Sequence, residues 1–225
     1  MLTATFVRKD QITSSVASFW FKPNRQLRFI AGQFIQITLP HTSPDDRGNK
    51  RWFTISSSPF NELISITTRS KPSYSTFKQA LCGLESSTQV TLSQPIGDFV
   101  LPKNKDTPLV FVAIGIGGTP FHSILKYLQD IKEVRDIKLI YLSKPSDHNI
   151  FDDAFSTLKE NLIVVTKNTQ NTANLTDIVI NSTSDAPQSQ IYLSGPERHV
   201  KDLGARLIKQ AISSSRIRTD YFLGY

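Results

Sequence analysis

Residues 109–120 read LVFVAIGIGGTP, and this stretch decides the fold of the second half of the chain. Six apolar residues in a row are typical of a strand that is buried on both faces. Gly115, Gly117 and Gly118 end the run, and Thr119-Pro120 opens a helix candidate. Such a turn lets the backbone approach a pyrophosphate, whose charge the free N–H groups of a helix start receive. A plain strand-to-helix turn also uses glycine, so the loop alone leaves both interpretations open.

The alternation of apolar runs and helix candidates continues after this stretch. It predicts an α/β domain with a parallel sheet covered on both faces. The predicted strands are 109–114, 137–142, 162–165 and 190–193, and the predicted helices are 119–132, 150–160, 174–181 and 197–213. Residues 220–225 are expected to lie beyond the last helix and to add little to the core.

Before residue 104 the chain has a different rhythm. Short runs of β-branched and aromatic residues, separated by turn residues, predict a closed or nearly closed antiparallel β-barrel. The predicted strands are 2–7, 15–21, 33–39, 52–57, 63–68, 88–93 and 98–101, with one helix over 75–84. Residues 1–104 and 105–225 are therefore expected to form two domains. The polar stretch HTSPDDRGNK, residues 41–50, is expected to be an exposed loop.

The cysteine and histidine content restricts the chemistry. Cys82 is the only cysteine, so the chain offers neither an internal disulfide nor the about four thiolates of an iron–sulfur cluster. The four histidines show no metal-ligand spacing, so we expect no metal and an organic cofactor for any redox step. No apolar run approaches the roughly 20 residues of a transmembrane segment, and the N-terminus lacks a secretory signal. A cytoplasmic protein is expected.

The formal net charge of +7 at pH 7 is compatible with nucleic acid, an anionic cofactor or an acidic protein partner. Much of the excess lies near the C-terminus, at Arg198, Lys201, Arg206, Lys209, Arg216 and Arg218. Their spacing is equally typical of a solvated helix face. The sequence contains no aromatic-interleaved basic motif of a nucleic-acid module, and we expect no nucleic-acid partner.

Three motifs stand at Arg51-Trp52-Phe53-Thr54, at Gly115 to Pro120 and at Ser194-Gly195-Pro196. In order and interval they resemble the R-x-[YF]-[ST], G-x-G-x-T-P and C-G-P motifs of the ferredoxin-NADP reductase family. The chain departs from the commoner pattern at Phe53, Ile114 and Ser194, where tyrosine, glycine and cysteine are usual. The resemblance covers nearly the whole chain. It implies an FAD-binding β-barrel domain followed by an NAD(P)-binding α/β domain, with the reactive rings meeting in the cleft between them.

The resemblance assigns the first motif to the flavin. It implies that the Arg51 guanidinium pairs with the diphosphate and that the Phe53 ring lies against the isoalloxazine. The Thr54 hydroxyl would face flavin N5, and Trp52 belongs to the same cofactor-binding strand. The turn from Pro95 to Phe99 resembles the one that closes the barrel of the family.

Four hydroxyls downstream are further candidates for the flavin site. The resemblance places Thr67 and Thr68 of one strand there, together with Ser75 and Thr76 at the start of the single barrel helix. Ser75 and Thr76 would supply a second phosphate contact. An ordinary helix N-cap is the alternative interpretation of the same pair.

The resemblance implies the NAD(P) contacts in the second domain. Gly115, Gly117 and Gly118 would approach the pyrophosphate, with Thr119 capping the helix and Pro120 in its first turn. Ser143 and Lys144 stand where NADPH-preferring members hold the 2′-phosphate, although Lys144 suits plain solvent exposure equally well.

The last motif and the C-terminus complete the expected site. Ser194 would lie beside the nicotinamide, with Gly195 and Pro196 at the cofactor. Asp220 would influence protons, and Phe222 or the terminal Tyr225 would cover the flavin until nicotinamide enters. Thr54, Ser194, Asp220 and Phe222 are thus the expected catalytic residues.

The implied function is that of an NAD(P)H-dependent flavoprotein reductase. Hydride would pass from NAD(P)H to FAD, and electrons would then reach a separate acceptor such as an acidic ferredoxin or flavodoxin. Two alternatives remain open: a non-catalytic electron-transfer or regulatory subunit of a larger complex, and an enzyme that reduces free flavin.

Overall fold

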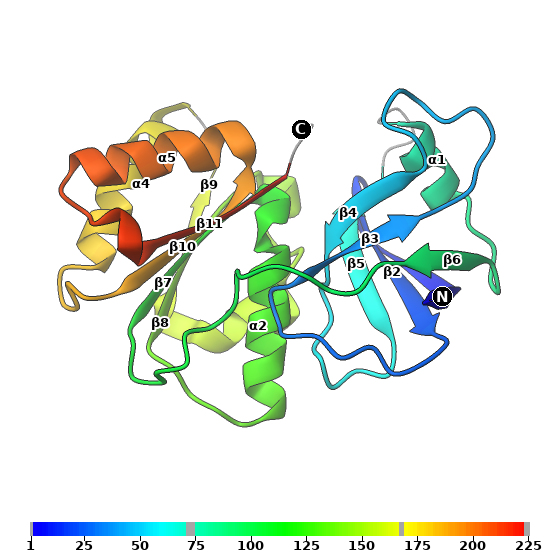
Figure 1. Cartoon of the computed structure of the whole chain (residues 1–225). Coiled ribbons are helices and arrows are strands. Elements are labelled where there is room, and N and C mark those ends of the chain that lie inside the picture. Colours follow the sequence, from blue (N-terminus) through cyan, green and yellow to red (C-terminus); the bar gives the residue numbers. More distant parts are fainter. Residues whose placement is uncertain (1, 71–74, 167–168, 223–225) are drawn as a thin grey trace. The chain divides into compact units, whose positions relative to one another are not determined.

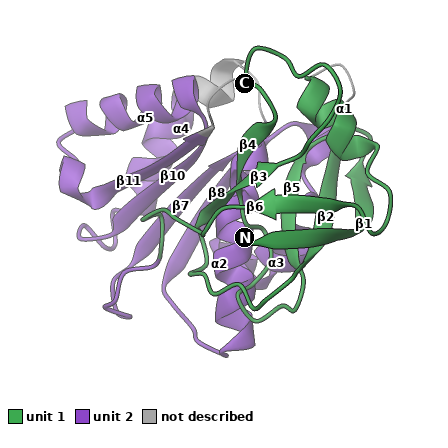
Figure 2. Cartoon of the chain, turned by 45° about the vertical axis from the view of Figure 1, so that its right-hand side comes forward, with its two compact units in different colours: residues 1–100 green, residues 101–225 purple. Residues whose placement is uncertain are grey.

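The structure is a computed structural model that describes residues 2–70, 75–166 and 169–222. The chain divides into two compact units, Met1–Val100 and Leu101–Tyr225, which are coloured separately in Figure 2. Each unit has its own hydrophobic core. None of the helices in the described ranges has the length and apolar character that crossing a membrane requires.

Unit 1 is an antiparallel barrel (Figure 1). Its strands are β1 (Thr3–Thr13), β2 (Val16–Pro23), β3 (Phe34–Thr38), β4 (Lys50–Thr54), β5 (Ile64–Arg69) and β6 (Gln89–Leu92), in the order β4-β3-β6-β1-β2-β5. The two edge strands meet just beyond β4, where Ile55 forms an isolated bridge with Ile66. The Ser56 N–H also donates to the Ser65 carbonyl at 2.8 Å. The barrel predicted from the sequence is therefore confirmed.

The barrel core follows from the alternation of its strands. In β3, Ile35 and Ile37 are fully buried, whereas Phe34, Gln36 and Thr38 are only partly buried. The single helix, α1 (Thr76–Cys82), adds Phe77 and Leu81 to the same core. Burial of such apolar side chains is worth roughly 1.5–3 kcal/mol each, which makes this shared core the main source of stability of the unit.

The strand predicted over residues 98–101 is wrong. The structure has only an isolated bridge between Ile96 and Phe34, and the chain then turns at Gly97 with φ +118°. A Cβ atom on Gly97 would lie 2.8 Å from the Phe34 ring, so this turn is pressed against β3. The apolar residues that follow fill space instead of pairing, as the buried Phe99 shows.

Unit 2 contains a parallel sheet, which confirms the predicted α/β architecture. Its strands are β7 (Leu109–Ile114), β8 (Ile137–Ser143), β9 (Leu162–Thr166), β10 (Gln190–Pro196) and β11 (Ile217–Phe222), in the order β11-β10-β7-β8-β9. Its α-helices are α2 (Thr119–Asp130), α3 (Asp152–Phe155), α4 (Thr169–Ser182) and α5 (Glu197–Lys209). All six residues of the central β7 are buried, as its apolar run predicts.

Helices cover both faces of this sheet (Figure 1). On one face, Val179 of α4 and Leu203 of α5 belong to the same core cluster as Val112. On the other face, the Phe111 ring stacks on Phe121 of α2 at 4.6 Å, and aromatic residues of α3 pack against β8. Successive side chains of a strand point to opposite faces of the sheet, so neighbouring residues of one strand belong to different cores.

Two expectations for unit 2 are wrong. The helix predicted over 150–160 is a single α-turn, α3, followed by a 3₁₀ segment at Ser156–Asn161 in which Lys159 has φ +49°. Residues 217–222, where no strand was predicted, form β11, paired with β10 from Ile191↔Ile217 to Pro196↔Phe222. Their polar sequence, IRTDYF, suits an edge strand whose outer side is solvated. Tyr225 lies outside the described residues.

Candidate functional site

Two glycine segments meet at the carboxyl edge of the unit 2 sheet. A Cβ atom on Gly117 would lie 2.6 Å from the Gly195 Cα and closer still to the Ser194 carbonyl oxygen. Gly195 has φ +155°, and its Cβ would lie 2.7 Å from that of Ile114. Backbone therefore packs against backbone between the turn after β7 and the end of β10. This close contact is enough to require glycine at both position 117 and position 195, because a Cβ atom at either would clash.

The start of α2 lacks a side-chain cap. Gly118 occupies the N-cap position, no side chain accepts from the first turn, and that turn contains no acidic residue. Pro120 lies in the first turn, as predicted. The predicted capping role of Thr119 is wrong, because Thr119 is the first helical residue and its hydroxyl donates to the Ile116 carbonyl at 2.6 Å. A 3₁₀ turn, Gly115–Gly118, runs directly into α2, and its Ile116 carbonyl accepts the Thr119 N–H. The helix dipole favours an anion at this end, beside the glycine turn.

Ser194 and Asp220 are brought together by the pairing of β10 with β11. They are opposite one another in the parallel register. The Ser194 hydroxyl, which is fully buried, donates to Asp220 Oδ2 at 3.5 Å, a long hydrogen bond. Phe222 stands opposite Pro196, two residues further along, and is placed by its backbone alone. Two of the residues expected to act together are therefore neighbours although 26 positions separate them.

Ser143 and Lys144 are adjacent in sequence but differ in exposure. Ser143 ends β8 and is fully buried, and its hydroxyl has no hydrogen-bond partner among the described residues. Lys144 is exposed. A phosphate at the surface can reach the ammonium of Lys144, whereas the Ser143 hydroxyl lies beneath the surface in this conformation.

The first motif lies on β4 and presents its side chains alternately. Trp52 is 48% exposed and makes an edge-to-face contact with Phe34 at 5.3 Å. Phe53 points the other way, into the barrel core, where it is 9% exposed and lies 5.9 Å from the Phe77 ring. Thr54 is also buried. The exposed aromatic ring of the motif is therefore Trp52, while most of the Phe53 surface is already used by the core.

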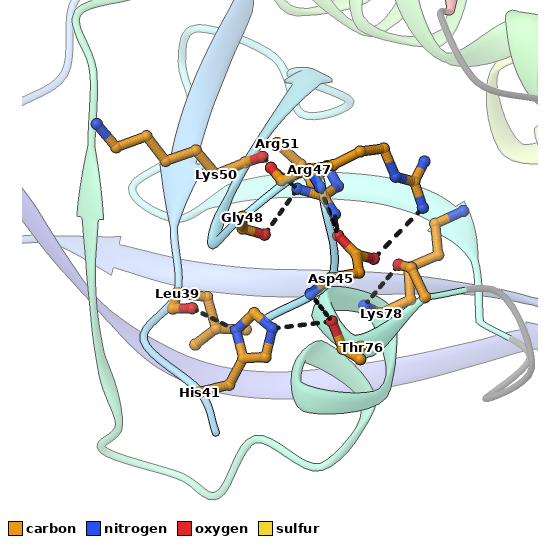
Figure 3. A network of polar contacts seen from close by, with 10 residues as sticks. Leu39, His41, Asp45, Arg47, Gly48, Lys50, Arg51, Thr76 and Lys78 are labelled. Carbon is orange, nitrogen blue, oxygen red and sulfur yellow. Dashed lines mark hydrogen bonds and ion pairs between the residues drawn. The ribbon is translucent and has the colours of Figure 1, made fainter. Parts of the chain in front are cut away.

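Arg51 is held by its own loop (Figure 3). Its Nη1 donates to the carbonyls of Arg47, Gly48 and Lys50 at 2.7, 2.9 and 2.7 Å. Its Nη2 donates to Asp45 Oδ1 at 2.7 Å, and its guanidinium lies 5.2 Å from the centre of the Phe77 ring. In the described part of the chain, no acceptor is bonded to the Nε–H of Arg51.

The loop before β4 is anchored to α1, which the sequence did not predict. His41 Nδ1 is hydrogen-bonded to the Leu39 carbonyl at 2.8 Å, and its Nε2 is hydrogen-bonded to the Thr76 hydroxyl at 3.2 Å. The Thr76 oxygen in turn accepts the Asp45 N–H at 3.0 Å (Figure 3). Ser75 is the N-cap of α1 and accepts the Lys78 N–H. The N-cap interpretation of Ser75 is thus confirmed, whereas the Thr76 hydroxyl binds the loop before β4.

The carboxyl group of Asp45 has a shifted pKa. Burial raises the pKa, but the hydrogen bonds from Arg51 and from the Arg47 N–H, together with the charges of both arginines, outweigh it and lower the pKa below its ordinary value. Asp45 is therefore a carboxylate at neutral pH. The remaining flavin-site candidates, Thr67 and Thr68, are buried in β5, and the Thr67 hydroxyl lies 2.7 Å from that of Ser18.

Known proteins share this architecture. A ferredoxin-NADP⁺ reductase from Neisseria gonorrhoeae with bound FAD and NADP matches at a TM-score of 0.79 and 18% identity, over 99% of this chain and 98% of that one. The flavohem-like FAD/NAD binding domain of a nitric oxide dioxygenase from Vibrio cholerae matches at a TM-score of 0.76 and 16% identity, over 98% of each chain. The chain has the ferredoxin-NADP reductase fold. The resemblance that its motifs indicated is thereby confirmed.

Two curated relatives of the chain are longer than the chain itself. Flavohemoprotein A of Dictyostelium discoideum is 24% identical over 233 residues, which cover 96% of this chain and 58% of that protein. The flavohemoprotein of Oceanobacillus iheyensis is 28% identical over 149 residues, or 63% of this chain and 36% of that protein. The chain thus spans 58% or less of these two relatives. No protein-family model matches it.

Two further clusters in unit 2 were missed by sequence reasoning. His122 of α2 is hydrogen-bonded to Asp153 of α3 at 3.0 Å, and Lys126 lies 3.5 Å from the same carboxylate. The hydrogen bond from His122, which outweighs burial, lowers the pKa of Asp153. Asp147 is buried in the loop after β8, and its carbonyl accepts the Tyr141 hydroxyl at 3.0 Å. Across the described ranges, His, Cys, Asp and Glu form no group of three that could hold a metal ion.

Proposed function

We propose that the chain is an NAD(P)H-dependent flavoprotein reductase, with FAD bound by the barrel unit and NAD(P)H by the α/β unit. One observation carries the proposal. The glycine turn Gly115–Gly118, which leads into α2 without a side-chain cap, lies at the same edge of the sheet as the Ser194–Asp220 pair, because Gly117 packs directly on Ser194. An anion site next to a buried hydroxyl and a carboxylate suits a dinucleotide whose reactive ring must be oriented.

Two features of the α/β unit suit NAD(P)H, the start of α2 and the exposed Lys144. The glycine turn Gly115–Gly118 would let the pyrophosphate approach the backbone at the positive end of α2, and no first-turn carboxylate opposes it. Lys144 is exposed at the end of the neighbouring strand, where it would pair with a 2′-phosphate. The buried Ser143 hydroxyl would join only if its surroundings moved. Ser194 is also fully buried, so its hydroxyl, bonded to Asp220, would contact the nicotinamide only if the side chains that cover it moved.

The barrel unit fits a flavin less completely. The Nε–H of Arg51 is available in the described structure for a diphosphate oxygen, and Arg47 adds a second cation nearby. Thr54 would orient the flavin from β4, and Trp52 offers the exposed aromatic surface that Phe53 lacks. Thr67, Thr68 and Ser75 are engaged in the barrel and the helix cap, and their cofactor role stays a prediction.

Hydride supply by NAD(P)H and its acceptance by FAD would be the chemistry of the cofactors. The contribution of the chain is to bind the two cofactors, to exclude water and to fix charges. Asp220 would hold a negative charge beside Ser194, which keeps the Ser194 hydroxyl proton directed at the carboxylate. Phe222 and Tyr225 stay predictions as the aromatic cover of the flavin.

The identity of the electron acceptor has the least direct support. The net charge of +7 favours an acidic partner such as a ferredoxin or flavodoxin. Part of the positive charge of α5 is neutralised by carboxylates of the same helix, however, since Lys201 pairs with Glu197 at 2.6 Å and Arg206 with Asp202 at 2.5 Å. The curated relatives are flavohemoproteins, so a haem protein is a second candidate acceptor. A subunit role without turnover and reduction of free flavin are the remaining alternatives.

The absorption spectrum of the purified protein tests the proposal. We expect a yellow protein whose released cofactor has the mass of FAD and which reduces ferricyanide with NADPH or NADH. A protein that stays colourless after incubation with FAD or FMN would refute the flavin assignment. A yellow protein without turnover would support the subunit alternative. Comparison of ferredoxin, a haem protein and free flavin as acceptors then separates the enzymatic alternatives.

A further inference from the structure

Arg51, which the proposed function assigns to the flavin diphosphate, is already paired with a carboxylate of its own chain. Asp45 Oδ1 accepts from Arg51 Nη2 at 2.7 Å, and Asp45 Oδ2 lies 3.6 Å from Arg47 Nη2. The side chains of Arg51 and Asp45 are only 15% and 21% exposed. Salt screens a partly buried pair less than a pair on the open surface. The pair is therefore a significant competitor for any second anion.

The position of Asp45 does not depend on Arg51 alone. Its Oδ1 accepts the Arg47 N–H at 3.1 Å, and its carbonyl accepts the Gly48 N–H at 2.8 Å, so the residue initiates a turn. Its own N–H donates to Thr76, which His41 holds in turn (Figure 3). The loop and α1 thus fix the carboxylate in front of the guanidinium. It is no freely moving surface side chain.

The donors of Arg51 limit how a phosphate group can approach. A guanidinium has five N–H donors and binds an anion best through two of them in parallel. Loop carbonyls occupy Nη1, and Asp45 occupies one donor of Nη2. A two-donor contact therefore needs the edge formed by Nε and Nη2, directly beside the carboxylate. The phosphate either remains next to that negative charge or displaces it.

We propose that Asp45 is an affinity-setting residue of the flavin site. It neutralises and orients Arg51 when no flavin is bound, and it opposes binding of flavins that carry phosphate. The inference rests on the proposed function, because it assumes that Arg51 binds the flavin diphosphate. Its consequence is selective, since FAD and FMN meet the carboxylate whereas riboflavin, which has no phosphate, does not. The wild-type chain therefore binds FAD less tightly than its cations alone would allow.

The test compares Asp45→Asn with Asp46→Asn in the full chain. Asparagine keeps the shape and one acceptor oxygen but removes the charge. Asp46 is exposed, has no described contact with Arg51 and offers the same charge change one residue away. Titrations of the flavin-free proteins with FAD, FMN and riboflavin, followed by flavin fluorescence at about 0.15 M salt, give the dissociation constants. Asp45→Ser, which retains a turn-forming hydroxyl, replaces Asp45→Asn if that variant does not fold.

Asp45→Asn should tighten FAD and FMN binding by roughly three- to tenfold, the range of a partly screened ion pair. Riboflavin binding should change by less than about twofold. Asp46→Asn should change the dissociation constants of FAD, FMN and riboflavin by less than about twofold as well. The inference is overturned if Asp45→Asn binds FAD more weakly or unchanged, or if riboflavin binding changes equally. In that case a wild type that binds flavin still supports the proposed function. A wild type that binds no flavin overturns both.

Discussion

Replacement of Gly117 by alanine tests the backbone contact on which the unit 2 site is built. The new Cβ would lie 2.6 Å from the Gly195 Cα, whereas ordinary contacts of Cβ atoms lie at 3.4–4 Å. The end of β10 would have to retreat by roughly 1 Å, and forcing extra atoms into a packed interior costs roughly 1–3 kcal/mol, occasionally more. We expect a loss of about 2–3 kcal/mol, which lowers the melting temperature of a domain of this size by roughly 5–10 °C.

Gly204→Ala is the matched control. Gly204 lies within α5, and its Cβ would find Leu193 at 3.8 Å, an ordinary contact. Alanine is favoured over glycine inside a helix by about 1 kcal/mol, so this variant should be at least as stable as the wild type. Thermal and urea unfolding of the flavin-free proteins measure both changes. Equal stabilities of Gly117→Ala and Gly204→Ala would refute the close backbone packing of Gly117 on β10.

Three further predictions test the sites themselves. Arg51→Ala should weaken FAD binding about ten- to hundredfold, because a charged hydrogen bond is worth roughly 1.5–3 kcal/mol, and Arg47→Ala should weaken it less, as flavin titrations would show. Lys144→Ala should raise the KM for NADPH more than that for NADH, and equal effects in steady-state kinetics would remove Lys144 from the site. Truncation after Thr219 should lower the melting temperature and the rate of flavin reduction together, since it removes half of β11 and the partner of Ser194; an unchanged melting temperature would contradict the pairing.

The elements predicted correctly from the sequence are those whose signal is local. The run LVFVAI gave β7 its bounds, because a central parallel strand is apolar on both faces and glycine ends it. β11 was missed for the opposite reason. An edge strand needs an apolar side chain only on its buried face, so IRTDYF looks like a tail until its partner β10 is known. At residues 98–101, apolar residues that fill space were mistaken for residues that pair.

The flavin motif shows a second limit of sequence reasoning. Alternation on β4 predicts that Trp52 and Phe53 face opposite ways. It does not predict which of them enters the core, because Phe77 of the distant α1 decides that. The Asp45–Arg51 pair was hidden for a similar reason. Turn residues such as those of 41–50 predict a loop, whereas the anchor that fixes this loop, Thr76, lies 31 positions away from Asp45.

Two of the three departures from the family motifs, Phe53 and Ser194, change side chains without changing the packing around them. Phe53 packs in the barrel core with 9% exposure, where the hydroxyl of a tyrosine would need a partner of its own. Ser194 makes its closest approach, the one to Gly117, through the backbone, so its side chain can change without loss of that contact. What changes at position 194 is the group presented to Asp220. A hydroxyl is a stronger hydrogen-bond donor than a thiol, so the carboxylate is bound more firmly here than it would be beside cysteine.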